Sequence, residues 1–89
     1  MRVVVVWRDR TDYARTVSEW LREFKRRTGK DLESLDPDTK VGEDFVRAYD
    51  IVRYPAIIAV MSDGKEQRRW EGLPLPLMDE VNFYAIGGM

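Results

Sequence analysis

The chain has 89 residues, of which 44% are hydrophobic and 35% charged, a composition typical of one soluble globular domain. It contains no cysteine and no histidine, which excludes disulfides, thiolate nucleophiles, imidazole acid–base chemistry and zinc sites built from these residues. The net charge is −1, although residues 1–30 carry nine Lys and Arg against four Asp and Glu. We therefore expect a single domain over residues 1–89, with residues 87–89 as a flexible tail.

The apolar runs do not predict membrane insertion or export. All are shorter than the roughly 20 residues needed to span a bilayer. The first residues form a short apolar block followed by charges, without the small-residue cleavage site of a secretory signal. We expect a cytoplasmic protein that does not contact membranes.

The first half of the chain predicts a strand, a helix and a second strand. Residues 2–7 are β-branched and uninterrupted, which suits a central strand covered on both faces. Over residues 12–28 the apolar side chains fall at helical spacing, and Thr11 or Asp9 is the expected N-cap. Residues 31–36 alternate between apolar and polar, which predicts a short edge strand.

The second half of the chain is organised around an apolar run that follows Pro55. This run is continuous, as expected for a strand that is buried on both faces, and it ends in the strongest short signal for a hairpin, Asp-Gly. The pattern predicts, in order, a helix over 43–49, a strand over 56–61, a turn at 63–64, a strand over 66–71 and a helix over 77–86.

The element order is therefore β-α-β-α-β-β-α, which belongs to the α/β class. Strands that are joined through a helix run parallel with a right-handed crossover, so the first two strands should be parallel. The last two should form an antiparallel hairpin. Placing the two apolar strands in the middle predicts a four-stranded mixed sheet in the order 2-1-3-4, with helices on both faces.

This order, with Tyr54-Pro55 before the third strand, resembles the thioredoxin/glutaredoxin superfamily over nearly the whole chain. In that superfamily a cis-proline precedes an apolar strand, an Asp/Asn-Gly turn and a strand that ends in glycine. Tyr54-Pro55, Asp63-Gly64 and Gly72 stand at the matching places here, and the small size is closer to glutaredoxin. The resemblance implies a thioredoxin-like fold and a cis Tyr54–Pro55 bond.

The superfamily's Cys-x-x-Cys motif follows the first strand and would fall here on residues 11–14, with Tyr13 at the aromatic position. Thr11 and Ala14 then replace the two cysteines. A hydroxyl of ordinary acidity does not substitute for a thiolate, and no base is nearby to activate it. We expect a redox-inactive protein without enzymatic activity and without a cofactor.

A shallow groove for an extended peptide is the main functional hypothesis. In the redox-active members of the superfamily, a substrate pairs with the backbone of the residue before cis-proline, which is Tyr54 here. The candidate groove residues are Arg8, Arg10, Thr11, Tyr13, Tyr54 and Pro55. These residues predict a small module that binds a protein or peptide partner of unknown identity, although Pro55 could also be only a structural corner of the fold.

Two other functions remain open. Glutathione binding, as in glutaredoxins, would use the backbone of Tyr54 and either Arg8 or Arg10, but Leu73-Pro74 stands where polar residues are required. Nucleic-acid binding would use the basic side chains of the first helix, and we expect these to form a solvated helix face instead. These side chains are Arg15, Arg22, Lys25 and Arg26.

A second candidate surface lies on the last strand. If Trp70 points outward beside Arg68, it is an exposed aromatic suited to a partner contact; alternatively, this face packs under a helix. Homodimerisation through Trp70 or through a short edge strand also remains open.

No metal site is predicted. The acidic segment 36–41 fails the calcium-loop pattern, because Lys40 replaces an oxygen ligand and Val41 replaces the required glycine. A solvated loop is the expected structure.

Overall fold

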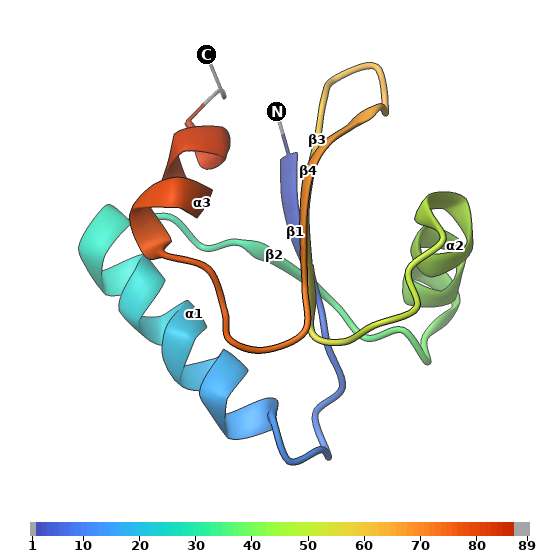
Figure 1. Cartoon of the computed structure of the whole chain (residues 1–89), viewed down its shortest axis with the longest axis horizontal. Coiled ribbons are helices and arrows are strands. Elements are labelled where there is room, and N and C mark those ends of the chain that lie inside the picture. Colours follow the sequence, from blue (N-terminus) through green and yellow to red (C-terminus); the bar gives the residue numbers. More distant parts are fainter. Residues whose placement is uncertain (1, 87–89) are drawn as a thin grey trace.

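A four-stranded sheet separates two layers of helices in the computed structural model, which describes residues 2–86 (Figure 1). The expected tail at 87–89 lies outside these residues. Among residues 2–86, no helix is long and apolar enough to cross a membrane. The elements follow the predicted order: β1 (Arg2–Val6), α1 (Ala14–Thr28), β2 (Glu33–Leu35), α2 (Lys40–Tyr49), β3 (Ala56–Val60), β4 (Glu66–Glu71) and α3 (Met78–Ala85).

The sheet has the predicted order β2-β1-β3-β4. Strand β1 runs parallel to β2, with Val5 beside Ser34, and antiparallel to β3, with Val4 beside Ile58. Strands β3 and β4 form the predicted antiparallel hairpin, in which Gly64 takes a positive φ of 91°. The two central strands, β1 and β3, are therefore the apolar ones, apart from Arg2 at the start of β1.

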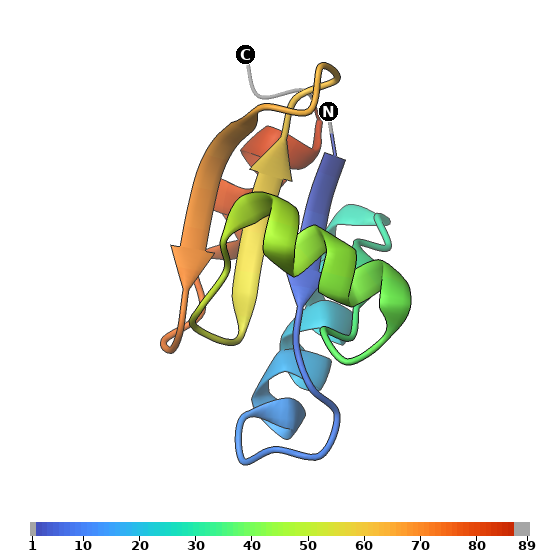
Figure 2. The same cartoon turned by 90° about the vertical axis from the view of Figure 1, so that its right-hand side faces the viewer.

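Alternation along the central strands divides the core into two parts. Val3 and Val5 of β1 pack with α1 and α3, whereas Val4 and Val6 pack with α2 on the other face. Strand β3 alternates in the same way, and all five of its residues are buried. Figure 2 shows α2 crossing one face of the sheet, in front of β1 and β3. Burial on both faces explains why these strands read as continuous apolar runs.

The predicted start of α1 is wrong. The helix begins at Ala14, not at residue 12, and its N-cap residue Tyr13 makes no capping hydrogen bond through its side chain. Thr11, one of the two expected caps, instead donates its hydroxyl hydrogen to the carbonyl oxygen of Arg8 at 2.9 Å. The side chain of Thr11 therefore stabilises the preceding loop and does not cap the helix.

The predicted start of α2 is also wrong, since the helix begins at Lys40 rather than at Glu43. Thr39 caps it by accepting a hydrogen bond from the Gly42 N–H at 3.1 Å. Gly42 looked like a residue before the helix, but it lies inside the first turn. It is needed there because a Cβ at this position would lie 1.8 Å from the carbonyl oxygen of Asp36.

Arg69 joins the end of α2 to strand β4. Its guanidinium donates to the carbonyl oxygen of Tyr49 and, at 3.3 Å, to that of Asp50, the left-handed residue that ends the helix. It also pairs with Glu66 at 2.6 Å, and this hydrogen bond raises the pKa of Arg69 above its ordinary value. The side chain is only 20% exposed, so these contacts are shielded from water.

We expect Gly42→Ala to destabilise the protein by about 2 kcal/mol, the scale of overpacking a tight site. Alanine in place of glycine normally stabilises a helix, so a loss would reverse the usual sign. Urea unfolding measures the change, with Val41→Ala as the control at the exposed neighbouring position. Equal stability of the Gly42→Ala variant and the wild type would contradict the close approach to Asp36.

Replacing Arg69 by methionine removes the contacts between α2 and β4, and we expect a loss of about 2–3 kcal/mol in the free energy of unfolding. Arg68→Met is the matched control. Its side chain is 48% exposed and forms a surface pair with Glu80, so its loss should cost less than about 1 kcal/mol. Similar losses in the two variants would mean that Arg69 is no more than another surface charge.

Candidate binding site

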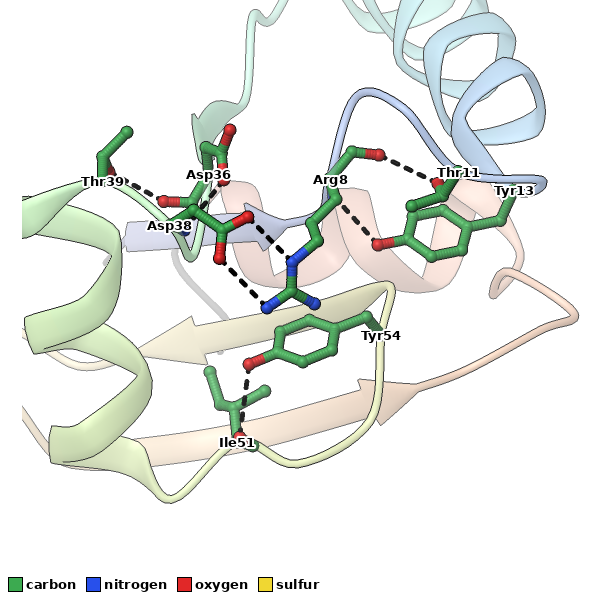
Figure 3. A network of polar contacts seen from close by, with 8 residues as sticks. All are labelled: Arg8, Thr11, Tyr13, Asp36, Asp38, Thr39, Ile51 and Tyr54. Carbon is green, nitrogen blue, oxygen red and sulfur yellow. Dashed lines mark hydrogen bonds and ion pairs between the residues drawn. The ribbon is translucent and has the colours of Figure 1, made fainter.

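Three connecting segments meet at one end of the sheet: the β1–α1 loop, the β2–α2 turn and the α2–β3 connection (Figure 3). The topology brings them together, because β1 and β2 are parallel and end at this edge, whereas the antiparallel β3 begins there. The carboxyl ends of strands next to helix-joined crossovers are common sites for ligands. The end of the sheet beyond β1 is therefore the candidate binding site.

Arg8 lies at the centre of this region. It donates to both carboxylate oxygens of Asp38, with Nε to Oδ2 at 3.0 Å and Nη2 to Oδ1 at 3.3 Å. Its guanidinium carbon lies 4.7 Å from the ring centroid of Tyr54, a cation–π contact. The hydrogen bonds to Asp38 raise the pKa of Arg8 above its ordinary value. Arg8 thus links all three segments.

The loop that precedes α1 is folded around the backbone of Arg8. The Arg8 N–H donates to the hydroxyl oxygen of Tyr13 at 2.9 Å, and the Arg8 carbonyl oxygen accepts from the Thr11 hydroxyl at 2.9 Å. Thr11 and Tyr13 lie in the segment where the sequence resemblance places the Cys-x-x-Cys motif. Their polar groups are used to hold the loop, as Figure 3 shows.

The Tyr54–Pro55 bond is cis, as the resemblance implies. Pro55 is fully buried, so it does not form part of the surface. Within residues 2–86, neither the backbone N–H nor the backbone carbonyl of Tyr54 makes a hydrogen bond. In contrast, the Pro55 carbonyl oxygen accepts from the Gly72 N–H at 2.8 Å. Val52 and Arg53 also make no main-chain hydrogen bond among residues 2–86, but both are exposed, whereas Tyr54 is half-buried beside Pro55.

Arg10 shares a cavity with Arg8, one of the other predicted groove residues. It lines a cavity of about 350 Å³ together with Arg8, Asp9, Asp36 and Asp38. An adjoining cavity of about 250 Å³ shares Asp9 and Asp36. The remaining residues around this second cavity are Trp7, Ser34 and Leu35. No sequence motif marked these cavities, because their walls come from the β1–α1 loop and from β2 with the turn that follows it, which are distant in the sequence.

Two of the features that bear on glutathione binding are visible in the structure. Arg8 is paired with Asp38, and Pro74, which has no N–H to donate, follows Leu73 through a second cis bond. The cis Leu73–Pro74 bond was not predicted from the sequence.

The basic face of α1 is compensated by neighbouring carboxylates. Arg26 and Arg27 both pair with Glu23, and their hydrogen bonds lower the pKa of Glu23 to about 2. Two further pairs are Arg15 with Glu19 and Lys25 with Asp31. Of the four side chains considered for nucleic acid, Arg22 is the one without an ion pair among residues 2–86. The other three are each paired with a carboxylate.

Trp70 lies half-buried beneath α3, with Arg68 beside it. Its ring packs edge-on against Tyr84 at 5.5 Å between centroids, and its indole N–H donates to Glu80. The guanidinium carbon of Arg68 lies 5.2 Å from the centroid of the Trp70 ring. Arg68 and Trp70 therefore lie side by side on β4, Arg68 exposed and Trp70 half-buried against the core.

No protein-family model and no curated protein matches the chain. Among solved structures, thioredoxin 1 from the thermophilic eubacterium Thermosipho africanus TCF52B is similar, with a TM-score of 0.64. The match covers 97% of this chain and 91% of the thioredoxin, at 13% sequence identity. Such a low identity establishes the fold but not the activity. The chain has a thioredoxin-like fold, and it contains none of the cysteines on which thiol–disulfide exchange depends.

Proposed function

We propose that this chain is a redox-inactive protein-interaction module that binds an extended peptide along Tyr54. The observation that carries the proposal is the pair of unsatisfied main-chain groups of Tyr54, the N–H and the carbonyl, next to the buried Pro55. Main-chain groups of this kind provide affinity when an extended peptide adds to a sheet edge.

Rigid surroundings support this proposal. The guanidinium of Arg8 packs on the ring of Tyr54. Arg8 is itself held by Asp38 through its side chain and by Tyr13 through its backbone N–H. A surface that is already ordered before binding loses less conformational entropy when the partner arrives. The polar contacts around Arg8 therefore favour a preformed site over a loop that must fold on binding.

Selection of linear peptides from a phage-displayed library against the purified protein tests the proposal. A selected peptide should shift the backbone amide signals of Tyr54 and of residues 8–13 in an ¹⁵N-labelled sample, and it should slow hydrogen exchange of the Tyr54 amide. Failure to enrich any peptide, or shifts confined to α3 and Trp70, would contradict the proposal.

N-methylation of the peptide tests the main-chain contact directly. Methylating the nitrogen that pairs with Tyr54 should weaken binding about fivefold, the value of one net hydrogen bond. Methylating the next nitrogen is the matched control, because alternate N–H groups of a strand point away from the partner. On the protein side, Tyr54→Ala should weaken binding, whereas Phe83→Ala, at an exposed aromatic on α3, should not.

A further inference from the structure

The smaller cavity at the end of β1 and β2 has a lining that none of the functions above uses. One indole, one aliphatic side chain, one hydroxyl and two carboxylates surround it: Trp7, Leu35, Ser34, Asp9 and Asp36. No positively charged side chain lines it. The lining thus combines an apolar wall and an aromatic ring with negative charge.

The two carboxylates are available for a ligand. Among residues 2–86, neither Asp9 nor Asp36 forms an ion pair. The nearby Arg8 pairs with Asp38 instead. Arg10 lines only the adjoining cavity and forms no ion pair with Asp9 or Asp36. One oxygen of Asp36 accepts from the Asp38 N–H at 2.9 Å, which leaves the second oxygen free of any hydrogen bond in this part of the chain.

The indole of Trp7 is half-buried and packs against the core. Within the described residues its N–H donates to no acceptor, whereas the N–H of Trp20 donates to the carbonyl oxygen of Pro76 and that of Trp70 donates to Glu80. An indole is the aromatic ring that cations contact most favourably. The Trp7 ring and two carboxylates that form no ion pair among residues 2–86 line the same cavity, and this combination suits a cation.

We propose that this cavity binds the side chain of a lysine from a partner protein. Its volume of about 250 Å³ is below the roughly 300–1,000 Å³ of typical small-molecule pockets, which favours a single side chain. Lysine carries a compact ammonium group on a flexible four-carbon stem. The stem lies against Leu35 and the Trp7 ring, and the ammonium group lies between Asp9 and Asp36.

Chemical-shift titration with N-acetyl-lysine N-methylamide tests this site directly and does not depend on peptide binding at Tyr54. The indole N–H signal of Trp7 should shift with ligand concentration, and the indole signals of Trp20 and Trp70 serve as internal controls. The norleucine analogue, which has the same stem without the charge, should bind at least about fivefold more weakly, because it lacks the cation–π and ion-pair contributions. Added salt should weaken the binding of the lysine ligand.

The double variant Asp9→Asn, Asp36→Asn should weaken lysine binding about tenfold, in line with the loss of two charge-assisted contacts. Asparagine at position 36 retains an oxygen to accept from the Asp38 N–H, so the turn should remain. Asp63→Asn is the matched control: Asp63 makes the same kind of contact, with the Lys65 N–H at 3.0 Å, in the β3–β4 loop. This control should bind lysine as the wild type does.

Three results would overturn the lysine site: no shift of the Trp7 indole signal, equal binding of the norleucine analogue, or unchanged binding by the double variant. A protein that binds the lysine ligand at Trp7 but pairs with no peptide at Tyr54 would retain this site while refuting the proposed function. The reverse result would refute the lysine site alone.

Discussion

Burial of β1 and β3 on both faces is the constraint on which the rest of the structure depends. Two adjacent strands with apolar side chains on both faces need a helical layer on each side of the sheet. The chain meets this need by sending α1 and α3 to one face and α2 to the other (Figure 1). Since α1 and α2 each begin beyond the end of a parallel strand, their leading loops meet at one edge. The candidate site follows from the way the core is built.

The contacts of Arg8 order the loop that precedes α1. The sequence resemblance places the superfamily's two cysteine positions in the segment before α1, and in this chain Thr11 and Tyr13 of that segment bond to the backbone of Arg8. Asp38 and the ring of Tyr54 then fix the guanidinium (Figure 3). An exposed ion pair alone contributes little to stability, so this network is better understood as positioning a loop than as holding the fold together.

Two different kinds of recognition are proposed for the same end of the sheet. At Tyr54 the groups on offer are main-chain donors and acceptors, which bind any extended segment and discriminate little among sequences. Around Trp7 the groups on offer are an indole and two carboxylates, which discriminate by charge. Arg8 lies between them, since it covers the ring of Tyr54 and lines the adjoining cavity. Affinity and specificity would then come from separate parts of one surface.

The sequence by itself determined the order of the elements, the sheet order and the two buried strands, because these depend on local periodicity and on the strong preference for parallel strands to be joined by a helix. It also located Tyr54-Pro55 through the superfamily resemblance. It misplaced the starts of α1 and α2. Before α1 the Thr11 hydroxyl bonds to the Arg8 carbonyl, and in α2 the absence of a side chain at Gly42 allows close approach to the Asp36 carbonyl. Capping residues have several local partners to choose from, and packing decides among them.

Only the tertiary structure decided which side chains meet. Arg8 and Asp38 are thirty residues apart, and no local pattern predicts that they pair. Likewise, the cavity beside Trp7 exists only because the β1–α1 loop and the β2–α2 turn lie together at the edge of the sheet. Local patterns specify helices and strands one at a time, whereas a site depends on the relative positions of distant segments, and those are fixed only when the core is packed.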